Sequence, residues 1–316
     1  MRIRFWGVRG SLPAPKVPAE IQDKIRAIIE QISPEDAASP AAKEQFLKGL
    51  PPWLFGIVGG NTSCVSLDWG DQTQRIVFDA GSGIRELGIA SAKDDPKIAA
   101  YHLFFSHFHW DHIMGFPFFN PGYDPSVSIT FYSPREGLEA ALTNQMQAPH
   151  FPVALDTMGA AKTFKRLTEP LVIPSKEGNL TVTCKKMKHP GDSYAYKVSG
   201  GQRSFIYATD AELGPPDFLD TPENVSFFKD ADIAVIDSQY TLQDAIEKYN
   251  WGHSSFRAAT DFAAKWGIKH LVLFHHEPTY NDREVYNILQ SAQWYAEEMQ
   301  FSLPVTLAVE GLELIL

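Results

Sequence analysis

Histidines and one aspartate crowd a short stretch of this sequence. Four of the ten histidines lie between residues 102 and 112, and the densest part reads Ser106-His107-Phe108-His109-Trp110-Asp111-His112. In an extended strand end, His107 and His109 project to the same side, and a following turn can swing Asp111 and His112 towards the same point. Imidazole and carboxylate groups suit zinc, iron or manganese. The pattern therefore predicts a metal site.

One short segment cannot complete the ligand shells of two metals, so distant ligands are expected. Three positions stand at the ends of strand-like runs: His189, Asp210, and either His275 or His276. A carboxylate such as Asp210 can bridge two cations, which a neutral histidine cannot do.

A further histidine, His253, precedes the helical run 256–264, whose start Ser254 or Ser255 can cap. A helix start of this kind binds phosphate through backbone N–H groups and the helix dipole. An imidazole there could stabilise transition-state charge or protonate a leaving oxygen. The alternative is a histidine of the capping region with no chemistry. Asp79 and Asp237 are candidates for orienting metal-bound imidazoles, or equally for solvated acids at strand ends.

The elements that must position these residues can be read from hydrophobic patterning. Strands are expected at 2–6, 64–68, 75–79, 103–105, 180–185, 194–198, 204–208, 233–236 and 271–274, with a last pair at 305–308 and 312–316. Helices are expected at 136–147, 256–266 and 283–299, and an irregular region with a short helix at 148–170. Runs of strands followed by helices indicate two packed sheets with helices outside.

One segment, 17–54, departs from this pattern. Ile21, Ile25, Ile28 and Ile29 form a helical stripe, which predicts a helical insertion between two strands. It is either a lid over a site or a plain surface excursion, and its length does not decide between them. The chain is otherwise expected to form one hydrolase domain over residues 1–316.

The complete set of candidate ligands resembles that of the metallo-β-lactamase superfamily. The resemblance implies an α/β fold, a four-layer αββα sandwich, with two metals at one edge of the sheets. It further implies that His107, His109 and His189 hold the first metal. Asp111, His112 and His275 would hold the second, with Asp210 bridging. His275 is preferred because Leu273-Phe274-His275 resembles the Leu-x-His form of the terminal motif, and His276 is the fallback.

Three features indicate a branch of that superfamily. The run 189–196 lacks the second histidine of the glyoxalase and lactamase types and is closer to the phosphodiesterase branch. Trp251-Gly252-His253-Ser254-Ser255 resembles the His-Ser-Thr motif of ribonuclease Z and related cyclic-phosphate phosphodiesterases. The runs 5–13 and 59–63 resemble the opening signature of the same branch. Within them, Arg9 is the one residue expected to be able to meet a phosphate.

Composition narrows the substrate. The formal net charge is −10, whereas proteins that grip long nucleic acid through phosphates usually carry a basic surface. Ribonuclease Z-like enzymes hold tRNA with a protruding arm, and no long basic, glycine-rich arm is visible. Aromatic residues near the cluster could stack a base or belong to the core: Phe108, Trp110, Phe116, Phe118, Phe119, Tyr123 and Phe151.

These observations predict a cytoplasmic phosphodiesterase with two divalent metal ions, zinc or manganese, acting on a small cyclic nucleotide or related cyclic phosphate. A metal-activated hydroxide would attack, with Asp111 orienting the water and His253 assisting the leaving group. The alternatives are a tRNA 3′-processing endoribonuclease and a non-hydrolytic, metal-bound ligand sensor. Two cysteines do not suggest a disulfide framework, and no apolar run approaches the roughly 20 residues that span a bilayer. A homodimer is expected only from the family resemblance.

Overall fold

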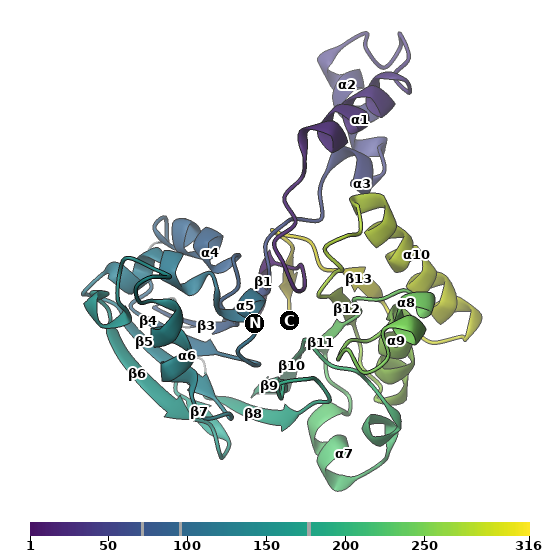
Figure 1. Ribbon diagram of the computed structural model, residues 1–316. Helices are drawn as coiled ribbons and strands as arrows, with labels where there is room; N and C mark the ends of the chain where they lie inside the picture. The colour runs from purple at the N-terminus through teal and green to yellow at the C-terminus, as the bar shows by residue number, and fades with distance from the viewer. Residues whose placement is uncertain (71–72, 95–96, 176–177) are drawn as a thin grey trace.

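Two seven-stranded sheets face each other in the computed structural model, which describes residues 1–70, 73–94, 97–175 and 178–316 (Figure 1). The first sheet has the order β14-β1-β2-β3-β4-β5-β6. Its strands are β1 (Arg2–Gly7), β2 (Cys64–Asp68), β3 (Gln74–Phe78), β4 (Ala100–Phe104), β5 (Ser128–Ser133), β6 (Ala161–Arg166) and β14 (Glu313–Ile315). From β3 to β6 the strands run parallel, so their carboxyl ends share one edge.

The second sheet has the order β13-β12-β11-β10-β9-β8-β7. Its strands are β7 (Leu171–Ile173), β8 (Leu180–Lys186), β9 (Tyr194–Gly200), β10 (Arg203–Ala208), β11 (Ile233–Asp237), β12 (Leu271–Phe274) and β13 (Val305–Leu307). Strands β10 to β13 are parallel, and β7, β8 and β9 pair antiparallel beside them.

Helices cover the outer face of each sheet (Figure 1). On the first sheet lie α4 (Ile84–Ser91) and α6 (Leu138–Gln145), and on the second α7 (Pro222–Phe228), α9 (Phe256–Lys265) and α10 (Asp282–Glu298). The short helices α5 (Trp110–Ile113) and α8 (Leu242–Glu247) follow β4 and β11 at the strand ends. Short 3-10 turns occur at Phe116–Phe118, Asn120–Tyr123, Leu155–Thr157 and Pro215–Phe218. The expected four-layer αββα sandwich is confirmed.

Aromatic side chains fill the space between the sheets. Phe78 of the first sheet stacks on Tyr207 of the second with 5.1 Å between ring centroids, and Phe5 lies 6.1 Å from Phe274. All four are fully buried. Burying one such side chain contributes about 1.5–3 kcal/mol, so these contacts hold together the two strand edges from which the site is built.

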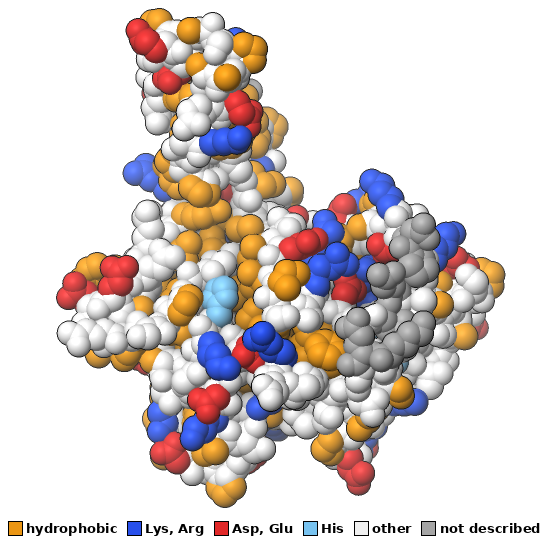
Figure 2. All heavy atoms as spheres, turned by 180° about the vertical axis from the view of Figure 1, so that it is seen from behind, with side chains coloured by type: hydrophobic (Ala, Val, Ile, Leu, Met, Phe, Trp, Pro, Cys, Tyr) orange, Lys and Arg blue, Asp and Glu red, His pale blue; other side chains and the backbone are white. Residues whose placement is uncertain are grey.

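The segment 17–54 forms an arm that projects from the sandwich (Figure 1). It contains α1 (Pro18–Ile29) and α2 (Pro40–Gly49) and leads into α3 (Pro52–Phe55), and neither α1 nor α2 has a buried residue. Hydrophobic side chains gather on the arm and at its root (Figure 2). At the root, Asp282 of α10 binds Lys16 at 3.3 Å and Lys24 at 2.5 Å.

The structure differs from the sequence-based expectations in the middle of the chain and at its last two strands. The segment 148–170, predicted to be irregular, contains the edge strand β6, and the expectations also missed β5 and β7. The last two strands are not a pair, because β13 joins β12 and β14 joins β1 in the other sheet.

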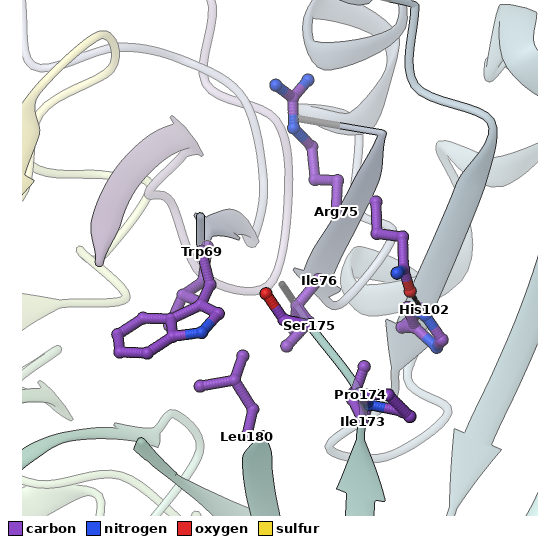
Figure 3. Close-up of a pocket in the computed structure, with 10 residues that line it drawn as sticks. Trp69, Arg75, Ile76, His102, Ile173, Pro174, Ser175 and Leu180 are labelled. Carbon is purple, nitrogen blue, oxygen red and sulfur yellow. Dashed lines mark hydrogen bonds between the residues drawn. The ribbon is translucent and has the colours of Figure 1, made fainter. Parts of the chain in front are cut away.

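Among the described residues, the longest apolar helical stretches fall short of what a membrane crossing requires. A small pocket of about 20 Å³ lies at the amino ends of β3 and β4 (Figure 3). Trp69, Ile76 and Leu180 give it an apolar lining, and His102 at its side is already bonded to the Gln74 side chain at 3.1 Å and to the Tyr132 hydroxyl at 3.2 Å. It is small for a ligand site and offers no free polar group for orientation.

Candidate metal centre

The predicted ligands all lie at one edge of the sandwich, where parallel strands of both sheets end. The loop after β4 carries the cluster, the turn between β8 and β9 carries one histidine, and the ends of β10 and β12 carry the rest. In chain order these are His107, His109, Asp111, His112, His189, Asp210 and His275. Except for His109, each is buried.

Four of these side chains form a first group. The candidate ligand atoms of His107, His109, His189 and Asp210 all lie within 4.8 Å of one another. Asp210 Oδ2 is 3.6 Å from Nε2 of both His107 and His189. His109 presents Nδ1 to the group, 3.2 Å from His189 Nε2.

The side chains of a second group also have their candidate ligand atoms within 4.8 Å of one another: Asp111, His112, Asp210 and His275. In this group, Nε2 of His112 and Nε2 of His275 each lie 3.1 Å from Asp210 Oδ1. Asp111 Oδ2 is 3.1 Å from His112 Nε2 and 3.3 Å from His275 Nε2. One oxygen of Asp210 therefore faces each group, as a bridging carboxylate would.

The chemistry of this donor set fits divalent cations. His107 Nε2 and His112 Nε2 are buried among the described residues without a hydrogen-bond partner, which is costly for polar nitrogens unless something else satisfies them. Burial opposes ionisation of Asp210, but the surrounding imidazoles outweigh it and hold the pKa of Asp210 well below its usual range. Buried imidazoles that converge on ionised carboxylates form the ligand set that zinc and related metals prefer.

Hydrogen bonds fix the orientation of the imidazoles. His112 donates its Nδ1–H to Asp79 at 2.8 Å, and His189 donates to the carbonyl of Gly252 at 2.9 Å. These bonds leave Nε2 of each ring facing the groups, which is how outer partners commonly orient metal-binding histidines. Asp79 thus takes the position expected from the sequence.

The partner of His275 is Gln239, a residue that sequence reasoning missed. His275 Nδ1 lies 3.2 Å from Gln239 Oε1, and Gln239 Nε2 donates to Glu277 at 3.0 Å. Gln239 stands two residues beyond β11, and this strand-end position was the available signal.

His276, the fallback ligand, points elsewhere. Its Nε2 lies 2.8 Å from the carbonyl of Ala308, and desolvation by burial lowers its pKa to about 3. The structure therefore brings His275, and not His276, to the second group.

His253 stands beside both groups without joining them. It donates Nδ1–H to Asp237 Oδ2 at 2.7 Å, and its ring lies 5.0 Å from that of His275. Burial disfavours the charged ring, but the Asp237 carboxylate outweighs burial and raises the pKa of His253 to about 9. The helix that follows is capped by Ser255, whose hydroxyl accepts from the Ala258 N–H at 3.2 Å. The candidate ligand atoms of Asp237, His253 and His275 also lie within 4.8 Å of one another. Because His275 already belongs to the second group, we do not count these three residues as a third group.

The loop after β1 contacts the second group directly. The backbone N–H of Ser11 donates to Asp111 Oδ2 at 2.7 Å. Gly10 packs against the His275 ring so closely that an added Cβ would lie 2.5 Å from its Cε1 atom. These contacts explain why the chain turns here with a glycine.

Arg9 does not meet the site. Its side chain is fully buried and donates to the carbonyls of Gly59, Glu277 and Tyr280 at 2.9–3.0 Å. The expectation that it could contact a phosphate is wrong, because the side chain is fully buried beneath these loops and its Nη2 faces Asp282 at 3.7 Å.

An open pocket of about 480 Å³ lies over the two groups. It is lined by Ser11, Phe108, His109, Trp110, Asp111, Asp210 and His253. Trp110 is 80% exposed, whereas Phe116 and Phe119 belong to the core. Of the described residues in 17–54, none lines this pocket.

Comparison with known proteins agrees with this geometry. Residues 74–276 match the family model described as "Beta-lactamase superfamily domain". Ribonuclease Z of Exiguobacterium sibiricum is 22% identical over 256 residues, which cover 66% of this chain and 81% of that protein. Among solved structures, the short form of human tRNase Z is similar with a TM-score of 0.58, at 17% identity and with 100% and 99% of the two chains covered. Unliganded yeast PDE1 gives a TM-score of 0.60, at 14% identity and with 100% and 99% covered.

Proposed function

The chain belongs to the beta-lactamase superfamily, as a metal-dependent hydrolase of the branch that includes ribonuclease Z, and from this premise we propose that it hydrolyses a small cyclic nucleotide or related cyclic phosphate. The observation that carries the proposal is Asp210, which presents one carboxylate oxygen to each of two histidine-rich groups. A charged His253 stands beside them at the same pocket.

Two divalent cations, zinc or manganese, would occupy the two groups. When bound, they supply Lewis-acid stabilisation of a phosphoryl group and a more acidic water. The first would be held by His107, His109 and His189 and the second by Asp111, His112 and His275, with Asp210 shared.

Asp111 is proposed to orient the attacking water or to accept its proton. Its carboxylate is fixed by the Ser11 N–H and lies at the wall of the pocket. The pKa of Asp111 is held well below its usual range, since His112 and His275 outweigh its burial. The carboxylate is therefore ionised when a water must be held in place.

His253 is proposed to protonate the leaving oxygen. Because Nδ1–H is bonded to Asp237, Nε2 is the nitrogen from which a proton can be given up. A pKa of about 9 keeps the ring protonated at neutral pH, as a general acid requires.

The charge distribution favours a small substrate over tRNA. The net charge is −10, and the arm segment 17–54 has six acidic and four basic residues, so it does not offer the phosphates of a long RNA a basic surface. A pocket of about 480 Å³ falls in the range of small-molecule sites. A tRNA 3′-processing endoribonuclease is the second candidate, because the relatives named above include ribonuclease Z.

A substrate screen tests the proposal. Purified protein reconstituted with Mn²⁺ or Zn²⁺ is assayed on bis(p-nitrophenyl) phosphate, cyclic mononucleotides and precursor tRNA. Turnover of cyclic mononucleotides without cleavage of precursor tRNA is expected. Cleavage of precursor tRNA alone would favour the second candidate, and two bound metals without any turnover would make the protein a ligand sensor.

A further inference from the structure

Arg135 lies beside the metal centre in a position that the proposed mechanism does not use. It follows β5 by two residues and its side chain is exposed. The guanidinium carbon lies 5.6 Å from the centroid of the Phe108 ring, and Nη1 donates to the carbonyl of Gly191. A cation over an aromatic face is attracted by the ring, so Phe108 and Gly191 together hold the guanidinium in place.

The guanidinium is next to the first group of ligands. A Cβ added at Gly191 would lie 3.0 Å from His109 Nε2 and 3.8 Å from Arg135 Nη1. The imidazole of His109 and the guanidinium of Arg135 therefore both border the space beside Gly191. His109 presents its other nitrogen, Nδ1, to the first group.

Arg135 forms no close ion pair among the described residues, and the nearby Asp192 carboxylate, whose pKa Lys186 and Arg135 lower, bonds Lys186. The neighbouring lysines are paired, Lys186 with Asp192 at 2.7 Å and Lys188 with Glu212 at 2.6 Å. Within the described residues, no carboxylate lies within 4.0 Å of the Arg135 guanidinium. In a chain of net charge −10, an unpaired arginine at this edge creates a local positive field.

Arg135 and Phe108, which contact each other, line two different hollows. Phe108 lines the pocket over the metal centre, and Arg135 lines an open groove along α6 and the end of β6. The other cations of the groove are Lys165 and Arg166, and Arg166 is paired with Glu136. Arg135 is the cation of this groove that also contacts Phe108 at the metal pocket, and the acidic residues of the groove are Glu136 and Glu139.

We propose that Arg135, held against Phe108, forms a second subsite that binds a phosphate of the substrate other than the one that is cleaved. The proposal rests on the proposed function, since it places the scissile phosphodiester at the metals. A guanidinium can offer two parallel N–H donors to phosphate oxygens, which a lysine cannot do. The preferred substrate class is thus a nucleotide that carries a terminal phosphate in addition to the cleaved diester.

A matched pair of chromogenic substrates tests the subsite. Thymidine 5′-(p-nitrophenyl phosphate) has only the scissile phosphate, and its 3′-phosphorylated form has a second one. For the metal-loaded wild type, kcat/KM is expected to be about tenfold higher for the 3′-phosphorylated form, the range of a charge-assisted contact. Arg135→Gln should remove that advantage through KM and leave the singly phosphorylated substrate unchanged. Arg135→Lys should keep only part of it.

The control variant is Arg203→Gln, which removes the same charge at the start of β10, the end of the strand remote from Asp210. It should leave the preference intact. Equal losses in the two variants would mean a general field effect and would overturn the proposal. No preference in the wild type, or an undiminished preference in Arg135→Gln, would also overturn it.

A binding measurement separates this proposal from the proposed function. Thymidine 3′,5′-bisphosphate and thymidine 5′-monophosphate are titrated into metal-loaded protein by calorimetry. Tighter binding of the bisphosphate by about tenfold, lost in Arg135→Gln, supports the subsite even if no phosphodiester is turned over. Equal affinities overturn the subsite even if the enzyme hydrolyses cyclic nucleotides.

Discussion

Replacing Asp237 with asparagine should move the alkaline limit of catalysis. Asp237 Oδ2 accepts the Nδ1–H of His253 at 2.7 Å, and its Oδ1 accepts the backbone N–H groups of Gln239 and Ser254 at 3.1 and 3.2 Å. An asparagine can keep the two Oδ1 bonds but not the bond that Oδ2 accepts from the Ala211 N–H at 3.3 Å, and the negative charge is lost.

The magnitude follows from the pKa of His253. A value of about 9 instead of 6.5 means that the site favours the protonated ring by roughly 3 kcal/mol. Without the Asp237 carboxylate, burial opposes the charged ring and only Asp210 and Asp111 still favour it, so the pKa of His253 should fall towards its ordinary value of 6.5. At pH 8 the protonated fraction then falls by roughly thirtyfold, whereas at pH 6 it falls by less than about twofold.

The assay is kcat against pH for the metal-loaded enzyme on a cyclic mononucleotide. The alkaline limb of the profile should lie near pH 9 in the wild type and about two pH units lower in Asp237→Asn. Asp232→Asn is the control, because Asp232 is also a mostly buried strand-end acid but bonds Lys269 at 2.9 Å, away from the site. Its profile should match the wild type.

Two results would refute this reasoning. An equal loss of kcat at pH 6 and pH 8 would show that the variant damages the site and does not change its protonation. Loss of bound metal, measured by elemental analysis, would make Asp237 a ligand, together with His253 and His275.

Three further predictions concern the metal centre and its support. Asp210→Asn should lose bound metal as measured by elemental analysis, because the shared carboxylate is removed; full metal retention would contradict a bridging role. Gly10→Ala should lower kcat and destabilise the fold by about 1–3 kcal/mol in urea unfolding, since the new Cβ meets the His275 ring. The control is Gly49→Ala, whose Cβ would meet no atom and which should not destabilise the fold. Burial lowers the pKa of His276 to about 3 in the folded state, so below about pH 6.5 the unfolded chain binds a proton that the folded protein excludes. The free energy of unfolding should therefore fall by roughly 2 kcal/mol between pH 7 and pH 5. His276→Gln should reduce that slope, and an unchanged slope would show that His276 is not its source.

The parts of the molecule that could be predicted from the sequence have strong local signals. Buried strands such as β2 and β12 are unbroken apolar or alternating runs, and the predicted bounds agree with those observed. The cluster at 107–112 combines ligand types with a spacing that an extended strand end and a turn can use. Candidate ligands that directly follow strands could be predicted to lie close together, because parallel strands bring their carboxyl ends to one edge of a sheet.

The parts that were missed lack such signals. The edge strand β6 is mostly exposed on both faces, so its sequence, Ala161-Lys162-Thr163-Phe164-Lys165-Arg166, shows little alternation. Gln239 acts through an amide that could serve many purposes, and the partner of His189 is a backbone carbonyl, which no residue type reveals. Arg135 depends on the packing of three separate loops.

Backbone conformation at the strand ends explains why these elements converge. Asp79, Asp210 and His275 stand directly after β3, β10 and β12, or one residue later, and their φ angles are +57°, +47° and +65°. Side chains other than glycine rarely adopt this left-handed region, which costs about 1–2 kcal/mol per residue. In each case the turn ends a parallel strand and leaves a buried side chain at the metal centre. The same strain at three strand ends, two of them in one sheet and one in the other, indicates that fold stability has been given up to place an outer carboxylate, the shared ligand and the last histidine around one point.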